Sequence, residues 1–299
     1  MLENHGIPEE KIHHVFQQSE ALFALPLEHK MALSAKEKSR GYRPLYDQTV
    51  DRVNQKEPDT KEGYFINFER ERTDENPDLF MGPNIWPSEQ LIPGWKETMQ
   101  DYYSAVQDVG LKILRIIAEG LDLEPDFFAQ RYTNVMGKLE LIRYTPEISS
   151  PDDGIFGVGA HTDYGMMTLL LTDDVPGLQI LMDGKWQDIP PRRGTFICNI
   201  GDMTQRWTNG YLKSARHRVV NKLGRVRYSI PFFVDPDNDA EVACLPQFCS
   251  KENPAKYAPT TYGKYLLETF KETLEEEATR ARTRGMNKSS VSVIRPCSL

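Results

Sequence analysis

The segment His161-Thr162-Asp163 carries two side chains that can bind a metal ion. Residues two apart in an extended strand point to the same face, so this imidazole and this carboxylate can converge on one point. His217 lies close to another predicted strand and can supply a second imidazole. Two histidines and one carboxylate leave several metal positions open, which is typical of non-haem Fe(II) oxygenases. Zinc accepts the same ligands but usually keeps one open position.

A His-x-Asp triplet by itself often occurs by chance, so the distribution of histidines matters. The chain has six histidines, and four of them lie within residues 5–29, in a region that looks helical. The other two, His161 and His217, lie in the region that is rich in predicted strands. This distribution favours one metal site formed by His161, Asp163 and His217.

A second pair of polar residues, Arg227 and Ser229, lies on one face of a later predicted strand. That strand is otherwise apolar and continues through residues 230–233. A guanidinium group binds a carboxylate through two parallel hydrogen bonds, and a hydroxyl group beside it can add another. Because a buried cation needs a partner anion, the pair predicts a carboxylate ligand, and a dicarboxylic cosubstrate would provide it.

The elements that must position these residues differ along the chain. Apolar residues at helical spacing predict a helix from Pro8 to about Phe23 and a longer one from about Trp95 to Leu121. Residues 40–93 are rich in Pro, Asp, Asn and aromatic residues, which indicates loops with short strands such as Gly63 to Asn67. A short helix is expected after Glu124.

Short apolar runs separated by Gly, Pro, Asn and Asp occupy residues 138–234 and predict an antiparallel sandwich or barrel. The runs are Leu139–Tyr144, Met166–Leu171, Leu178–Met182, Thr195–Ile200, Arg218–Val220 and Arg227–Phe233. A charged helix is expected from about Tyr262 to Arg282, and residues 285–299 are expected to be disordered.

The composition of the chain limits the kinds of molecule that the protein is expected to bind and the compartment in which it is expected to lie. The net charge is −8 and no dense run of Lys or Arg occurs, so we expect no nucleic-acid partner. No apolar run is long enough to span a membrane, and the polar first residues do not form a signal peptide. The four cysteines form no CxxC pair and indicate free thiols in a reducing compartment. We therefore expect a cytoplasmic protein, and we also predict a monomer.

Several segments of the chain resemble the isopenicillin N synthase-like 2-oxoglutarate/Fe(II)-dependent dioxygenases. The metal-binding segments that resemble this family are Gly159-Ala160-His161-Thr162-Asp163-Tyr164-Gly165 and Ser214-Ala215-Arg216-His217-Arg218-Val219. Other similar segments are Asn4-His5-Gly6-Ile7, Lys61-Glu62-Gly63-Tyr64, Asn199-Ile200-Gly201-Asp202 and Trp207-Thr208-Asn209-Gly210. The resemblance covers the chain up to about residue 270.

This resemblance implies a mixed α and β fold, in which helices brace a double-stranded β-helix (jelly-roll) core. Residues 1–95 would form an N-terminal helical and loop region. Residues 96–299 would form the jelly-roll domain with its bracing helices and tail. His161, Asp163 and His217 would bind catalytic Fe(II). Arg227 and Ser229 would hold the distal carboxylate of 2-oxoglutarate, and Tyr144 matches a tyrosine that many members use on the same cosubstrate.

The chain departs from the family pattern at two places. The family often has Asn two positions before the tyrosine, where this chain has Ile142. The family also begins with a strand or two before Asn-His-Gly, whereas here only Met1-Leu2-Glu3 precede that motif. We therefore expect a shortened start and a sheet that lacks an edge strand. Tyr42, Phe65 and Phe233 are candidates for lining the substrate pocket.

The implied reaction is hydroxylation, desaturation or ring closure of a small organic metabolite with O2, releasing succinate and CO2, with ascorbate as a candidate reductant. Three alternatives remain open from the sequence. One is an iron oxidase of the same fold that uses no 2-oxoglutarate, and another is an inactive small-molecule-binding protein. The third is a metal-dependent hydrolase or isomerase in a cupin-like barrel. Succinate release, metal content and dependence on O2 distinguish these alternatives.

Overall fold

The computed structural model describes residues 1–34, 40–69, 82–132 and 136–269, and its core consists of two antiparallel sheets. The larger sheet has the order β1-β2-β3-β10-β5-β8, and the smaller has the order β4-β9-β6-β7. The strands of the larger sheet are β1 (Gly41–Arg43), β2 (Lys61–Asn67), β3 (Met136–Tyr144), β10 (Arg227–Asp235), β5 (Met167–Thr172) and β8 (Ile197–Ile200). Those of the smaller are β4 (Val158–His161), β9 (His217–Val219), β6 (Leu178–Met182) and β7 (Lys185–Asp188). The predicted jelly-roll core, mixed with helices, is confirmed.

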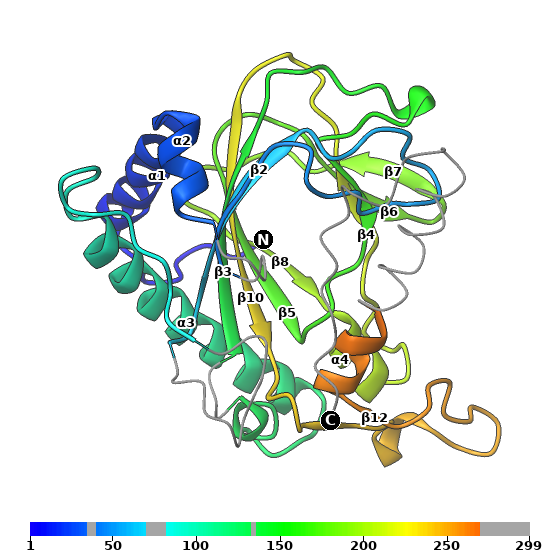
Figure 1. Cartoon of the computed structure of the whole chain (residues 1–299). Coiled ribbons are helices and arrows are strands. Elements are labelled where there is room, and N and C mark those ends of the chain that lie inside the picture. The colour runs from blue at the N-terminus through cyan, green and yellow to red at the C-terminus, as the bar shows by residue number, and fades with distance from the viewer. Residues whose placement is uncertain (35–39, 70–81, 133–135, 270–299) are drawn as a thin grey trace, which may run out of the picture.

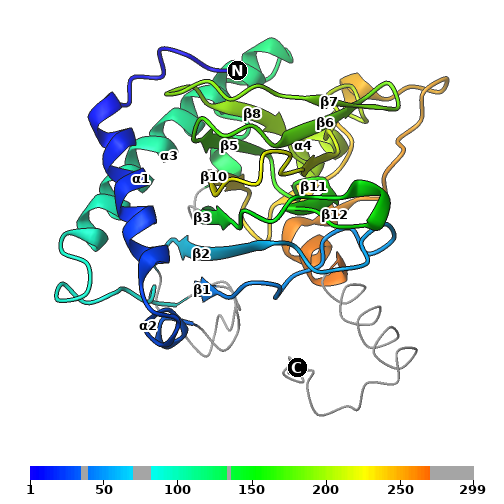
Figure 2. The ribbon, with the colours of Figure 1, turned by 90° about the horizontal axis from the view of Figure 1, so that it is seen from above.

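Helices cover the outer face of the larger sheet, so that this sheet lies between them and the smaller sheet (Figures 1 and 2). The α-helices are α1 (Glu9–Ala24), α2 (Leu27–Ala32), α3 (Trp95–Gly120) and α4 (Asp202–Trp207). A two-stranded sheet of β11 (Glu241–Val242) and β12 (Thr260–Thr261) lies near α4. Three 3-10 helices span Ala129–Arg131, Pro151–Asp153 and Pro246–Phe248.

The two long helices predicted near the start of the chain and before residue 121 are present as α1 and α3. The short helix expected after Glu124 is only a 3-10 turn at Ala129–Arg131. Residues 262–269 are helical, and the rest of the helix expected to residue 282 lies outside the described residues, as does the tail expected to be disordered. The first 95 residues contribute β1 and β2; β1 pairs with β2 and β2 pairs with β3, so this region shares the larger sheet.

Helix α3 packs on the outer face of the larger sheet through an apolar stripe. It begins after Gly94, whose φ of 68° suits a residue without a side chain. Fully buried residues then recur every three or four positions, at Trp95, Met99, Tyr102 and Val106. Farther along the helix, Gly110 allows a close approach to β10, because an added Cβ would lie 3.2 Å from a methyl group of Val234.

Alternation along the strands separates apolar from polar residues on the larger sheet. On its outer face, β3, β10 and β5 bury their apolar side chains against the helices; these are Leu139, Leu141, Ile230, Phe232, Val234, Leu169 and Leu171. The inner face, toward the smaller sheet, carries their polar neighbours Lys138, Glu140, Arg227, Ser229, Thr168 and Thr172. The main apolar core therefore lies outside the barrel, whereas polar and charged side chains line much of the inner face of the larger sheet.

The motif Lys61-Glu62-Gly63-Tyr64 places a charged side chain on each face of β2. On the outer face, the Glu62 carboxylate accepts hydrogen bonds from the Tyr42 hydroxyl, the Lys30 ammonium and the Arg143 guanidinium at 2.6, 2.7 and 2.8 Å. On the inner face, Lys61 pairs with Glu140 at 3.4 Å. Glu62 thus joins α2, β1, β2 and β3 through one buried charge.

The first residues of the chain dock beside the edge strand β8. Leu2 forms an antiparallel bridge with Phe196, with hydrogen bonds of 2.7 and 3.1 Å in the two directions. The Nδ1 atom of His5 accepts a hydrogen bond from the backbone of Ile7, and its Nε2 donates to the carbonyl of Gly194. The motif Asn4-His5-Gly6-Ile7 therefore holds the start of the chain against this edge of the larger sheet. Within the described part of the chain, no helix combines the length and apolarity needed to cross a bilayer.

We expect Glu62→Gln to lower the free energy of unfolding by about 3 kcal/mol, because removing one member of a buried charged cluster leaves its partners uncompensated. Urea denaturation measures this change. Glu119→Gln, at an exposed position near the end of α3, is the control and should change stability by less than about 0.5 kcal/mol. Equal stability of both variants would show that the Glu62 cluster does not stabilise the fold.

Candidate functional site

The three predicted metal ligands lie together where β4 and β9 pair. His161 ends β4 and stands opposite His217, the first residue of β9, while Asp163 lies in the turn after β4. The Oδ1 atom of Asp163 is 3.8 Å from Nε2 of His161 and 3.7 Å from Nε2 of His217. Among the described residues, this is the one group of three or more His, Cys, Asp or Glu side chains that could hold a metal ion.

The hydrogen bonds of both histidines leave Nε2 available as a ligand. Nδ1 of His161 lies 2.9 Å from the carbonyl oxygen of Gly159, and Nδ1 of His217 lies 3.1 Å from that of Ala215. A carbonyl only accepts, so each Nδ1 carries the proton and each Nε2 presents a lone pair. Burial and the neighbouring His217 lower the pKa of His161 to about 3. A neutral imidazole held in this way is suited to metal binding.

The carboxylate of Asp163 is oriented by two residues from neighbouring strands. Its Oδ2 atom accepts a short hydrogen bond from the Thr168 hydroxyl and one of 2.7 Å from Asn199 Nδ2. Thr168 and Asn199 are direct partners in the β5–β8 ladder. Burial raises the pKa of Asp163, but the two histidines and these two hydrogen bonds together lower it. Oδ2 is therefore occupied, and Oδ1 faces the imidazoles as an ionised ligand.

The segment Asn199–Asp202 also fixes the turn that carries Asp163. The backbone N–H of Asp202 donates to the carbonyl of Asp163 at 2.8 Å, and the Thr162 hydroxyl donates to the Asp202 carboxylate at 3.2 Å. Gly201 lies against Gly165 so closely that an added Cβ would be 2.3 Å from its carbonyl oxygen. The motif Asn199-Ile200-Gly201-Asp202 thus packs against the turn that carries Asp163 and fixes its position.

Sequence reasoning did not assign a role to Thr168 or Asn199. Asn199 belongs to a segment that resembles the dioxygenase family, and this resemblance was the available signal. Thr168 is a polar residue inside the apolar run of β5, where alternation could have indicated an inward side chain. Their common function depends on the pairing of β5 with β8, which the sequence does not reveal.

The predicted carboxylate-binding residues Arg227, Ser229 and Tyr144 also lie together. Arg227 is 2% exposed, and its Nε donates to the carbonyl of Val175 at 3.2 Å. Its guanidinium carbon is 4.8 Å from the centre of the Tyr144 ring, and the Tyr144 hydroxyl is 3.2 Å from that of Ser229. Within the described residues, Nη1 of Arg227 has no hydrogen-bond partner. Buried polar atoms are rarely left unpaired, so this nitrogen fits an anionic ligand.

The Arg227 group lies deeper in the barrel than the histidines. Tyr144 packs against Val219 and Val158 in a small apolar cluster between the sheets. Val219 is two residues beyond His217 on β9, which corresponds to about 7 Å along a strand. A ligand with one end at the histidines and a carboxylate at Arg227 would need to span a gap of this order.

The three candidate pocket residues do not all face this site. Phe65 and Phe233 lie on the inner face of the larger sheet, and Phe233 is the β-ladder partner of Thr168. Tyr42 pairs with Tyr64 on the outer face, and its hydroxyl is bound to Glu62. The prediction that Tyr42 lines the substrate pocket conflicts with this placement, because a loop-rich sequence does not show which face of β1 is inward.

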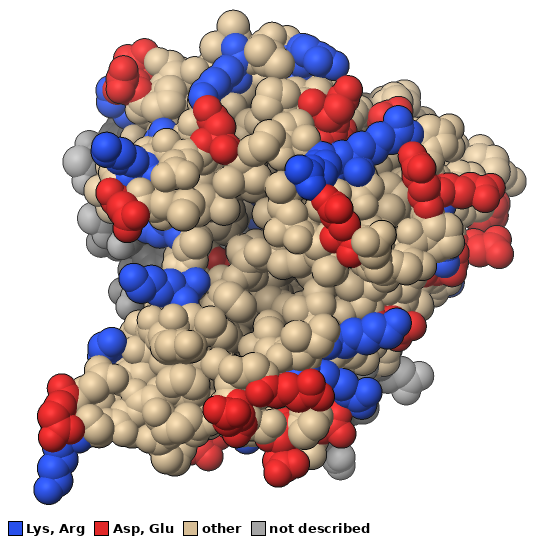
Figure 3. All heavy atoms as spheres, turned by 180° about the vertical axis from the view of Figure 1, so that it is seen from behind, with Lys and Arg blue, Asp and Glu red and all other residues tan. Residues whose placement is uncertain are grey.

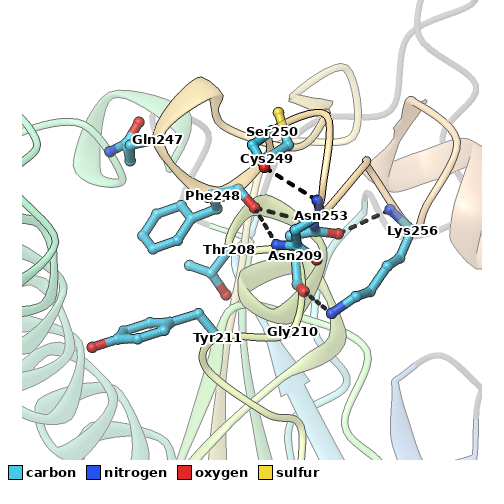
Figure 4. A pocket seen from close by; sticks show the side chains of 10 residues that line it. All are labelled: Thr208, Asn209, Gly210, Tyr211, Gln247, Phe248, Cys249, Ser250, Asn253 and Lys256. Carbon is cyan, nitrogen blue, oxygen red and sulfur yellow. Dashed lines mark hydrogen bonds between the residues drawn. The ribbon is translucent and has the colours of Figure 1, made fainter.

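A separate pocket lies where the loop of residues 247–256 meets the end of α4 (Figure 4). Asn209 organises it: its Nδ2 donates to the carbonyl of Phe248 at 3.1 Å, and its Oδ1 accepts from the backbone of Lys256 at 2.9 Å. Asn209 adopts a φ of 50°, which asparagine tolerates better than most residues. None of the predicted site residues lines this pocket, which is a junction between loops.

Comparison with known proteins agrees with this geometry. The model of the 2OG-Fe(II) oxygenase superfamily matches residues 127–236. The model of the "non-haem dioxygenase in morphine synthesis N-terminal" region matches residues 1–89.

Individual relatives match across most of the chain. Kihadalactone A synthase LFS of Citrus sinensis is 38% identical over an alignment of 280 residues that covers 90% of this chain and 82% of that protein. The 2-oxoglutarate-Fe(II) type oxidoreductase hxnY of Emericella nidulans is 37% identical over 90% of this chain and 79% of its own length. The crystal structure of a full-length Neurospora crassa protein in complex with alpha-KG and thymine superimposes with a TM-score of 0.78, at 30% identity, over 91% of this chain and 86% of that one.

We expect Asn199→Ala to weaken Fe(II) binding by about 10- to 100-fold, because loss of a group that orients a metal ligand typically has this effect. Anaerobic calorimetry with Fe(II) measures the affinity. Cys198→Ala, at the adjacent exposed position of β8, is the control and should bind Fe(II) as the unmodified protein does. Unchanged affinity in Asn199→Ala would mean that Asp163 does not depend on this hydrogen bond.

Proposed function

Because the chain belongs to the 2OG-Fe(II) oxygenase superfamily, we propose that His161, Asp163 and His217 bind its Fe(II). We further propose that Arg227, Ser229 and Tyr144 bind the distal carboxylate of 2-oxoglutarate. The protein is an oxidoreductase that uses Fe(II), 2-oxoglutarate and O2 to oxidise a small organic molecule. The observation that carries the assignment of residues is the buried, unpaired Nη1 of Arg227 beyond the His–Asp–His cluster.

The donor atoms fit both ligands. Two imidazoles that present Nε2 and one carboxylate oxygen, each on a side chain whose other polar atom is already hydrogen-bonded, suit Fe(II) and leave coordination positions for other molecules. Fe(II), 2-oxoglutarate and O2 together would supply the oxidising chemistry, with the cosubstrate leaving as succinate and CO2. Nδ1–H donation to Gly159 and Ala215 keeps both rings in one orientation throughout.

Arg227 and its neighbours would select the cosubstrate by charge and length. A guanidinium group forms a bidentate pair with a carboxylate, and the Ser229 hydroxyl lies on the same strand face to add a hydrogen bond. A five-carbon dicarboxylate can reach from the histidines to Arg227. A three-carbon keto acid such as pyruvate would leave Arg227 unpaired, so we propose that it does not replace 2-oxoglutarate.

The remaining features of the reaction and its setting are also proposals. Hydroxylation, desaturation and ring closure are all compatible with this site, with ascorbate as a candidate reductant. We propose a monomeric, cytoplasmic enzyme that does not bind nucleic acid. The net charge of −8 supports the last point, as does the face in Figure 3, where acidic side chains lie among the basic ones.

We expect His217→Ala to abolish turnover and to weaken Fe(II) binding sharply, because one of three protein ligands is lost. Succinate release and anaerobic Fe(II) titration measure the two effects. His14→Ala, at an exposed position of α1, is the control and should change neither. Normal Fe(II) binding by a folded His217→Ala protein would refute the assignment of this ligand.

We expect Arg227→Ala to raise the apparent 2-oxoglutarate KM by about 10- to 1000-fold, since truncating one partner of a buried charge pair costs about 2 to 5 kcal/mol. Fe(II) binding should remain nearly intact, and Arg227→Lys should recover only part of the loss, because an ammonium group cannot form the bidentate pair. Arg225→Ala, at an exposed position just before β10, is the control. Product formation without succinate would instead favour the oxidase that needs no 2-oxoglutarate, with Arg227 holding the substrate.

A further inference from the structure

The inner face of the larger sheet carries, besides Arg227 and Lys61, the cation Lys138, which lies between two aromatic rings. Its ammonium nitrogen lies 4.8 Å from the centre of the Phe233 ring and 5.3 Å from that of Phe65. Both distances fall within the range of cation–π contacts. The three residues come from β2, β3 and β10, neighbouring strands whose register places them on one face.

Lys138 lacks the partner that the other inward lysine has. Lys61 pairs with Glu140 at 3.4 Å, whereas no carboxylate of the described residues lies within 4 Å of Lys138. Asp235 acts on Lys138 electrostatically, but its carboxylate accepts a hydrogen bond from Tyr262. The ring faces attract the ammonium group without using its N–H donors, which therefore remain available to a ligand.

The position of Lys138 relates it to the iron site. Phe233 pairs with Lys138 on one side and with Thr168 on the other, and Thr168 donates to Asp163. Lys138 is thus two strand spacings from Thr168, which amounts to about 10 Å between Cα atoms. Arg227 lies six residues from Phe233 along β10, at the opposite end of this face. Lys138 is therefore placed beside the metal ligands but away from the proposed 2-oxoglutarate carboxylate.

We propose that Lys138, with Phe65 and Phe233, binds the carboxylate end of the organic substrate, so that the enzyme oxidises small organic acids. This inference rests on the proposed function, because it takes the oxidised carbon to lie next to His161, Asp163 and His217. The two phenylalanine rings contact the apolar part of the acid, and the ammonium group pairs with its carboxylate. The separation of about two strand spacings places the oxidised carbon several bonds from the carboxylate.

Paired ligands that differ only in charge test the proposal. The probes are phenylacetate, 3-phenylpropionate and hexanoate, each compared with its primary amide. Binding is measured by anaerobic calorimetry with Fe(II) and 2-oxoglutarate present, and succinate release is measured separately. We expect at least one acid to bind about 10- to 100-fold more tightly than its amide, as a charge-assisted hydrogen bond would produce.

Substitutions of Lys138 test whether its ammonium group is the partner of the carboxylate. Lys138→Met, which keeps the length of the side chain, should abolish the preference for acid over amide, and Lys138→Arg should retain it. Neither variant should change the KM for 2-oxoglutarate. Lys185→Met, at an exposed position of β7, is the control and should keep the preference.

Several results would overturn the proposal. The proposal is wrong if no acid binds, or if acids and amides bind equally well. It is also wrong if folded Lys138→Met keeps the preference for acids or has a raised KM for 2-oxoglutarate. Failure of the proposed function is a distinct result: 2-oxoglutarate would neither bind nor yield succinate. The calorimetric comparison of acid and amide would still report on Lys138 in that case.

Discussion

The separation of polar and apolar side chains onto opposite faces of the six-stranded sheet is the constraint on which the rest of the structure depends. In a strand, successive side chains point to opposite faces, so one stretch of β10 can present Ile230 and Phe232 to the helices and Ser229 and Phe233 to the barrel. The apolar face provides the driving force for folding by burial against α1 and α3. Because the outer face packs the main apolar core, the inner face does not have to, and it can carry charged groups.

Charged groups inside the barrel differ in how they are compensated. Lys61 and Glu140 pair within the protein, and Glu62 on the other face holds three donors. Arg227 and Lys138 have no carboxylate within 4 Å among the described residues, although Asp173 and Asp235 act on them electrostatically from farther away. Because burying a charge without compensation is costly, we infer that the paired charges stabilise the fold, and we propose that Arg227 and Lys138 bind ligands.

The candidate metal site combines the two sheets with the turn that carries Asp163. The histidines come from paired strands of the smaller sheet, whereas Asp163 is held by Thr168 and Asn199 of the larger one. Distances between the three ligands are therefore set by how the sheets face each other. The segment from Asn199 to Asp202 fixes the turn through backbone contacts that leave no room for a side chain at Gly201. Such support holds ligands in place before the metal binds.

The sequence alone determined the family, predicted the chemistry of the site and located most of the elements that carry it. Helical spacing located α1 and α3, and the apolar runs located five of the six strands of the larger sheet but only β6 and β9 of the smaller one. The types of His161, Asp163, His217 and Arg227 predicted iron and a carboxylate ligand. These features are local or depend on residue type. The structure decided that Tyr42 faces the helices, that Thr168 and Asn199 share one oxygen of Asp163, and that Lys138 lies between two rings. Each of these depends on which strands are neighbours and in what register, and such pairings join residues far apart in the chain that periodicity does not specify.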